Sequence, residues 1–111
     1  INDGNMFNSP DGLFFDTKGL LWIQTDGNYS NEDDFAGQGN NQMLVGDPAT
    51  GEIKRFLVGP KECEVTGAAM SSDGKTLFVG IQHPGSNWPD GGPLARSSVI
   101  AIKRTDNGLI G

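Results

Sequence analysis

Three side chains of types that bind metals or move protons, Asp26, Glu64 and His83, stand beside turn-forming residues in the sequence. Asp26 ends the strand-like run 21–25, whose first three residues are apolar, and this pattern is typical of a buried strand that places a polar ligand at its end. Carboxylate oxygens suit hard cations such as calcium or ferric iron, and a histidine beside a rigid proline can bind a metal or an anion. The residues therefore predict an oxygen-rich metal site that includes Asp26 and Glu64.

Each of these residues also has a purely structural interpretation. Asp26 and Asn28 could form only the side-chain-to-backbone hydrogen bonds of a turn, and His83 could be a turn histidine without a ligand. Glu64 precedes Val65 in a stretch that heads for the core, where an unpaired charge costs several kcal/mol. Glu64 therefore needs a positive partner, either an arginine or a metal ion.

Composition excludes several other classes of function. The 111 residues include 14 acidic and 8 basic side chains, and the basic ones are scattered, so nucleic acid is not an expected partner. No apolar run approaches the roughly 20 residues that cross a bilayer. The single cysteine, Cys63, cannot form an internal disulfide, and no His-Asn pair lies near it in the sequence to make it a nucleophile, so we interpret it as a small buried hydrophobe. The chain opens with Ile1, which favours a piece of a longer protein.

Short strands separated by glycine-rich turns must position the candidate ligands. Seventeen glycines, with many Asn and Asp residues, indicate many tight turns. In the first half of the chain we expect strands at 12–16, 20–25, 42–46 and 52–58. The polar stretch Gly27 to Asn41 is expected to be a long loop, which in a compact domain is usually functional or disordered.

The second half of the chain repeats the pattern of the first. The segment 67–70 follows 12–15 by 55 residues, and Leu77-Phe78-Val79 follows Leu21-Trp22-Ile23 by 56. The strand at 99–102 and the segment 108–110 continue the correspondence. A unit of about 55 residues with four short strands predicts an all-β fold of about two four-stranded antiparallel blades of a β-propeller.

The predicted organisation is a partial β-propeller domain over 1–111. Its first blade-like unit covers about 10–60 and its second about 61–111. Two blades cannot close a ring, so we expect either further blades of a parent chain or self-association through the exposed blade faces.

Five motifs carry a resemblance to a known family. They are Trp22-Ile23-Gln24-Thr25-Asp26-Gly27-Asn28, Asn40-Asn41-Gln42-Met43, Arg55-Phe56-Leu57-Val58-Gly59-Pro60, Cys63-Glu64-Val65-Thr66-Gly67 and Gln82-His83-Pro84-Gly85. In order and spacing they resemble the C-terminal part of PhoX-type alkaline phosphatases. The resemblance implies a hydrolase of the bacterial periplasm or cell exterior, with calcium and iron at the mouth of a propeller channel and phosphate esters as substrates.

The resemblance also assigns roles to some residues. It makes Asp26 and Glu64 metal ligands, and it includes Asn28 and His83 in the motif without giving them a role, so they are expected to line the site. The resembling proteins are several times longer, and their iron-binding cysteine lies early in a chain that this sequence does not cover, so Cys63 does not take that role. We therefore expect a fragment that is inactive in isolation, with its metals in the full-length protein.

Two other functions remain open at the level of sequence. One is a non-enzymatic propeller module that binds a partner through the loop 27–41, and the other is a calcium-dependent, lactonase-like propeller hydrolase. Convergence of the Asp26 and Glu64 carboxylates on one point would favour the metal-dependent phosphatase over the binding module.

Overall fold

The protein is described by a computed structural model that covers residues 7, 9–27, 40–85 and 87–111. The described residues form seven β-strands and no helix, and therefore no helix that could cross a membrane. The strands are β1 (Pro10–Phe15), β2 (Leu21–Thr25), β3 (Gln42–Asp47), β4 (Glu52–Val58), β5 (Glu64–Met70), β6 (Thr76–Gln82) and β7 (Ser98–Lys103).

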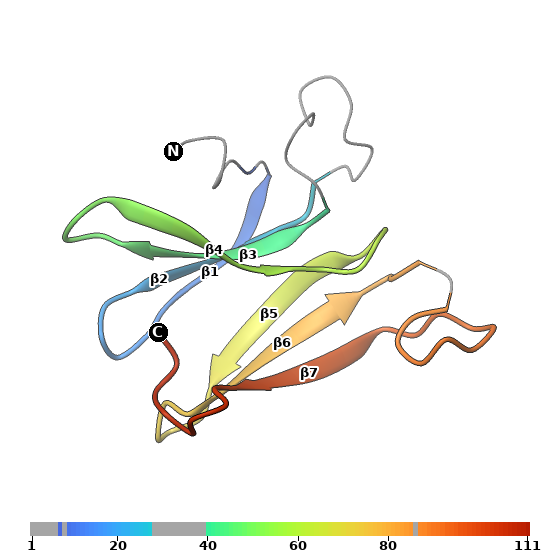
Figure 1. The fold of residues 1–111 in the computed structure, drawn as a ribbon. Coiled ribbons are helices and arrows are strands. Elements are labelled where there is room, and N and C mark those ends of the chain that lie inside the picture. The colour runs from blue at the N-terminus through green and yellow to red at the C-terminus, as the bar shows by residue number, and fades with distance from the viewer. Residues whose placement is uncertain (1–6, 8, 28–39, 86) are drawn as a thin grey trace.

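The strands pair into two antiparallel sheets in the order of the sequence. The first sheet has the order β1-β2-β3-β4 and the second the order β5-β6-β7, and the second lies against the first with β5 closest (Figure 1). Tight turns join most neighbours, for example at Gly19, Gly51 and Gly74, each of which has a positive φ that glycine adopts without strain. Because sequential strands are spatial neighbours, each sheet is a meander of the kind found in propeller blades.

The core lies between the two sheets. Trp22 and Met43 contribute from the first sheet, and the second sheet contributes Leu77, Val79 and Ile81. The three β6 residues alternate along the strand, so they share the face that looks toward the first sheet. The ring of Trp22 stacks on Phe14 with 6.2 Å between centroids and meets Phe56 edge-on at 4.9 Å, an arrangement that aromatic pairs favour.

The turn between β1 and β2 is built around the side chain of Asp16. Its Oδ1 accepts hydrogen bonds from the backbone N–H groups of Lys18 and Leu20, and its Oδ2 accepts one from Nε1 of Trp22. Burial raises the pKa of Asp16, but these hydrogen bonds outweigh it and hold the pKa below its usual value of 3.8. The carboxylate therefore ties the turn to the largest core side chain.

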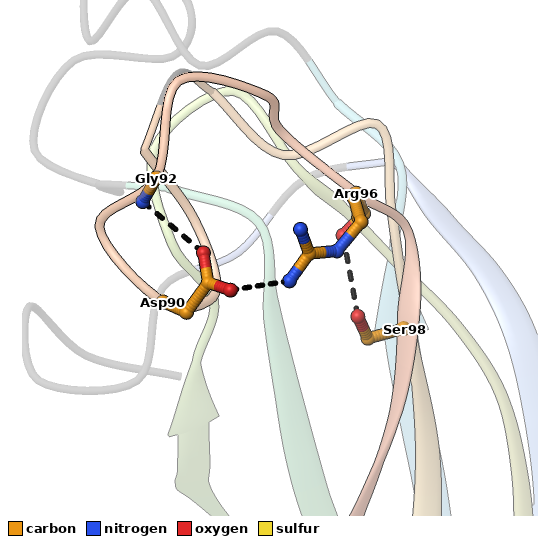
Figure 2. A network of polar contacts seen from close by, with 4 residues as sticks. All are labelled: Asp90, Gly92, Arg96 and Ser98. Carbon is orange, nitrogen blue, oxygen red and sulfur yellow. Dashed lines mark hydrogen bonds and ion pairs between the residues drawn. The ribbon is translucent and has the colours of Figure 1, made fainter.

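A second polar network holds the connection between β6 and β7. Arg96 Nη2 pairs with Asp90 Oδ2 at 2.5 Å, the N–H of Gly92 donates to Asp90 Oδ1, and the hydroxyl of Ser98 donates to the carbonyl of Arg96 (Figure 2). Hydrogen bonding by Arg96 and Gly92 lowers the pKa of Asp90. The network gives this long connection a defined path back to β7.

The all-β, antiparallel prediction is confirmed, and two details of the second half of the chain differ from the expectation. β5 begins at Glu64, three residues before the expected position 67, so Glu64 lies inside a strand. The segment 108–110 is not a fourth strand of the second sheet. Instead the N–H of Ile110 donates to the carbonyl of Gly74, and Ile110 is buried. The chain turns away from β7 because burying Ile110 in the core removes its apolar surface from water.

Candidate metal centre

Among the described residues, three carboxylates from three segments meet at one end of the sheets. Asp11 lies in β1, Asp26 follows the last residue of β2, and Glu64 opens β5. One oxygen from each lies within 4.8 Å of the other two. The structure therefore brings Asp26 and Glu64 together, as the predicted role as joint ligands requires, and it adds Asp11.

Asp11 reaches the cluster because β1 is irregular at its start. The pairing of β1 with β2 shifts register between Pro10 and Gly12, so Asp11 is an extra residue opposite Thr25 and Gln24. Such a bulge re-aims a side chain. The N–H of Asp26 donates to the carbonyl of Ser9 at 3.0 Å, which holds the start of β1 beside the end of β2.

Asn41 connects the backbone around the other two carboxylates. Its Oδ1 accepts hydrogen bonds from the hydroxyl of Thr25 (2.9 Å) and the N–H of Gly27 (2.7 Å). Its Nδ2 donates to the carbonyls of Gly27 and Cys63, each at 2.9 Å. Thr25 and Gly27 flank Asp26, and Cys63 precedes Glu64, so a single buried amide touches the chain beside both ligands.

Negative charge is crowded in the cluster. Burial raises the pKa of Glu64, and the negative charges of Asp26 and Asp11, together with a hydrogen bond to Asp26, raise it further, while His83 acts in the opposite direction. None of the ion pairs among the described residues involves these carboxylates. Two partners were expected for Glu64, an arginine or a metal ion, and among the described residues no arginine forms an ion pair with it.

The donor set fits a hard cation. Ionised carboxylates are acceptor-only groups, and calcium takes 6–8 oxygen ligands in flexible geometry. Three carboxylates would supply part of such a shell and leave positions for further ligands or a substrate. Ferric iron also accepts oxygen ligands, so the residues fit both ions that the sequence suggested.

His83 lies at the same end of the second sheet as Glu64. Gln82, the last residue of β6, pairs with Glu64, and His83 follows it with a positive φ of 52°. The side chain of His83 is exposed, its Nε2 lies 3.0 Å from Nε2 of Gln82, and its backbone N–H donates to the hydroxyl of Ser97. His83 is thus a neighbour of the carboxylates rather than a member of the cluster. Asn28, the other residue expected to line the site, lies outside the described residues.

Cys63 is a core residue, as the sequence suggested. Its side chain is buried in the cluster between the sheets, and burial raises the pKa of the thiol to about 11. A thiol with that pKa is protonated at neutral pH and is therefore neither a nucleophile nor a ready metal ligand.

Two residues of the centre escaped prediction from sequence. Asp11 stood in the irregular segment before the first expected strand. The repeat contains a signal for it, because β1 and β5 are equivalent strands and each has a carboxylate within its first two residues. In the sequence, Asn41 was noted only within the motif Asn40-Asn41-Gln42-Met43, and no role was predicted for it. Its partner Cys63 is 22 residues away, and no local pattern indicates that contact.

The chain is similar to known proteins over most of its length. A family model described as alkaline phosphatase PhoX matches residues 1–85. Among solved structures the chain is similar to "Pseudomonas fluorescens PhoX in complex with vanadate, a transition state analogue", with 64% sequence identity and a TM-score of 0.92. The match covers 96% of this chain and 19% of that one, so the chain spans about a fifth of the length of this relative. That relative has a propeller-type fold, whereas no curated protein matches the chain.

Proposed function

Because the chain belongs to the PhoX alkaline phosphatase family, we propose that it supplies part of the metal centre of a phosphatase that hydrolyses phosphate esters. Asp11, Asp26 and Glu64 are the proposed cation ligands. The observation that carries the proposal is the convergence of their oxygens within 4.8 Å. The vanadate complex of the Pseudomonas fluorescens relative supports a phosphate ester as the substrate.

Calcium and iron are the ions that we propose for the full-length protein. A cation bound there would neutralise the charge of a phosphate ester and stabilise the charge that develops during its hydrolysis. The three carboxylates of this chain would hold the cation through their oxygens. Without a cation, their like charge would repel the negative phosphate group, so a metal-free centre should bind substrate poorly.

We further propose that residues 1–111 are a partial propeller domain of a longer phosphatase. Two outer faces support this. Leu13 and Phe15 are 61% and 64% exposed on the first sheet, and Phe78 and Val99 are 41% and 73% exposed on the second. Apolar faces of that kind would be covered by neighbouring blades. Because only part of the ligand shell lies in this chain, the isolated segment should be inactive.

The proposed setting is the periplasm or the cell exterior, in keeping with the resemblance that the motifs carry. The net charge of −6 supports partners other than nucleic acid. Phosphate esters are the proposed substrate, and missing blades of the parent chain are the proposed neighbours.

The test compares Glu64→Gln with Glu62→Gln in the full-length protein. Gln matches Glu in size but lacks its charge, and Glu62 is an exposed residue outside the cluster. We expect Glu64→Gln to lower kcat/KM for p-nitrophenyl phosphate by about 100-fold or more at limiting calcium, with the upper range of metal-site effects as a guide. Glu62→Gln should keep wild-type activity. Equal activity of the two variants would make Glu64 a structural residue.

The same preparation separates the alternatives. A wild-type protein that hydrolyses a lactone but not p-nitrophenyl phosphate, with calcium and iron supplied, would favour the lactonase-like hydrolase. A protein that hydrolyses neither under any metal condition would favour the binding module. The loop 27–41, through which that module would act, lies largely outside the described residues.

A further inference from the structure

The geometry points to Asn41 as a positioning residue that sets the distance between Asp26 and Glu64, and we propose that it thereby determines the affinity of the metal centre. This inference rests on the proposed function of the carboxylate cluster. The side chain of Asn41 makes its hydrogen bonds to Thr25, Gly27 and Cys63. It would act only through the backbone on which the ligands stand.

The hydrogen bonds of Asn41 use the full capacity of its side chain. A carboxamide can donate two hydrogen bonds and accept two, and within the described residues Asn41 makes all four. The orientation of the amide is unambiguous, because Nδ2 faces two carbonyls and Oδ1 faces a backbone N–H. With 6% of its surface exposed, Asn41 has little competition from water.

The four bonds connect the two sheets at the end where the ligands lie. Thr25 and Gly27 hold Asp26 between them at the end of β2 in the first sheet. Cys63 directly precedes Glu64 at the start of β5 in the second sheet. The amide therefore spans the seam between the sheets, and its length fixes how far apart the two ligand-bearing backbones stand.

A further contact holds Asn41 in place. Its own carbonyl accepts a hydrogen bond from the N–H of Gly59 at 2.8 Å. The hydroxyl of Thr25 also accepts a hydrogen bond from the N–H of Gln42. Asn41 and its partner Thr25 are therefore both held by neighbouring backbone N–H groups. A residue that orients metal ligands needs such support.

A merely structural role for Asn41 predicts a different result from a positioning role. If Asn41 only stabilises the fold, its removal lowers the melting temperature and leaves the affinity of the folded centre for calcium unchanged. If it positions the ligands, the calcium affinity of the Asn41 variant falls further than that of another variant with the same loss of melting temperature. Calcium affinity and melting temperature must therefore be measured on the same variants.

The experiment uses the full-length protein and isothermal titration with calcium. The relevant binding event is the one that Glu64→Gln abolishes. We expect Asn41→Ala to weaken that event about tenfold or more, as loss of outer-sphere contacts does at metal sites. Asn40→Ala is the matched control and should bind calcium normally, since among the described residues the Asn40 side chain makes one long hydrogen bond, to the Gly59 carbonyl at 3.4 Å.

Asn41→Asp tests the direction in which calcium affinity changes. Asp has the same shape but adds a negative charge near the centre, so electrostatics alone would tighten calcium binding. Its second oxygen, however, would face the carbonyls of Gly27 and Cys63, where the amide donates now. Positioning therefore predicts weaker binding. Tighter binding in Asn41→Asp would overturn the proposal.

Two further variants keep the test decisive. Ile110→Ala removes a buried side chain at the opposite end of the sheets, next to the turn at Gly74, and serves as a stability control. Calcium affinity that falls equally in Ile110→Ala and Asn41→Ala would overturn the proposal. If Asn41→Ala does not fold, Thr25→Val replaces it, because it removes one of the four bonds, and several-fold weaker binding is then expected.

The failure of the inference can be told apart from the failure of the proposed function. Normal calcium binding in Asn41→Ala, together with loss of binding in Glu64→Gln, would leave the metal centre intact and exclude the positioning role. Unchanged binding in Glu64→Gln would show that the carboxylates hold no calcium, and the role of Asn41 would fall with them.

Discussion

Single side chains in this protein owe their behaviour to a few local contacts, and Asp16 is the clearest case. Its carboxylate accepts hydrogen bonds from Lys18, Leu20 and the indole of Trp22, and the net effect is a pKa below 3.8. A carboxylate with a lowered pKa stabilises the folded state above the unfolded pKa, and this contribution is lost as the pH falls through the folded pKa. Its effect therefore depends on pH in a known direction.

We predict that Asp16→Asn lowers the free energy of unfolding by about 1.5–3 kcal/mol at pH 7, the range for hydrogen bonds to charged groups. The amide nitrogen of the introduced Asn would face the Nε1–H donor of Trp22, and two donors cannot hydrogen-bond to each other. As the pH falls below 3.8 the wild type loses the same contribution, so the difference should shrink. Urea unfolding at pH 7 and at pH 3 measures both values.

Asp47→Asn is the control for that prediction. Asp47 lies in another hairpin turn, where its side chain accepts a hydrogen bond from the N–H of Ala49 in an exposed position. Its replacement should cost less than 1 kcal/mol. A difference for Asp16→Asn that stays constant with pH would contradict the assignment of the effect to the ionised carboxylate.

At the scale of elements, β5 and β6 show how a glycine permits an irregular pairing. The register shifts between Thr66 and Ala68, and Gly67 has a positive φ of 52°. Opposite the shift stands Gly80, where an added Cβ would lie 2.7 Å from the carbonyl oxygen of Thr66. The bulge brings that backbone so close that no side chain fits.

We predict that Gly80→Ala destabilises the protein by about 1–3 kcal/mol, the usual cost of overpacking. Gly46→Ala is the matched control, because Gly46 also lies within a strand but its added Cβ would meet nothing closer than 3.7 Å. Gly46→Ala should be neutral or slightly stabilising. Thermal unfolding of the two variants decides the matter, and equal melting temperatures would contradict the predicted clash.

The elements were largely predictable from sequence, whereas the centre was only partly so. Short apolar runs between turn-forming residues, such as Leu77-Phe78-Val79, are local patterns, and together with the repeat they located the strands within a few residues. Asp11 depends on a bulge, and Asn41 depends on a contact between sheets that closes only in the folded chain. Periodicity does not encode either of these, because both arise from the register between strands.

On the scale of the whole molecule, the two outer faces carry the apolar side chains that the core does not use. Leu13 and Phe15 share a face of β1 opposite to Phe14, which packs inward. Phe78 and Val99 lie on the corresponding outer face of the second sheet. The pair of sheets is therefore apolar on the inside and on both outer sides, as an internal part of a larger ring would be.

We predict that the isolated 111-residue chain self-associates through these faces. Sedimentation velocity should show oligomers, and the double substitution Leu13→Thr with Phe15→Thr should shift them toward monomer. Leu94→Thr is the control, because Leu94 is exposed in the connection before β7 rather than on a sheet face. A monomer at high concentration in the unsubstituted chain would contradict the prediction.

The seam at Asn41 has a consequence for recombining blades between related propellers. The first sheet contributes a side chain to the contact, whereas the second contributes only the backbone carbonyl of Cys63, which a residue of any type possesses. This hydrogen bond would therefore allow a chimera to replace the second blade with any residue at position 63 that is small enough for the core. A replacement for the first blade would have to carry the asparagine. The contact therefore restricts exchange of the first blade more than exchange of the second.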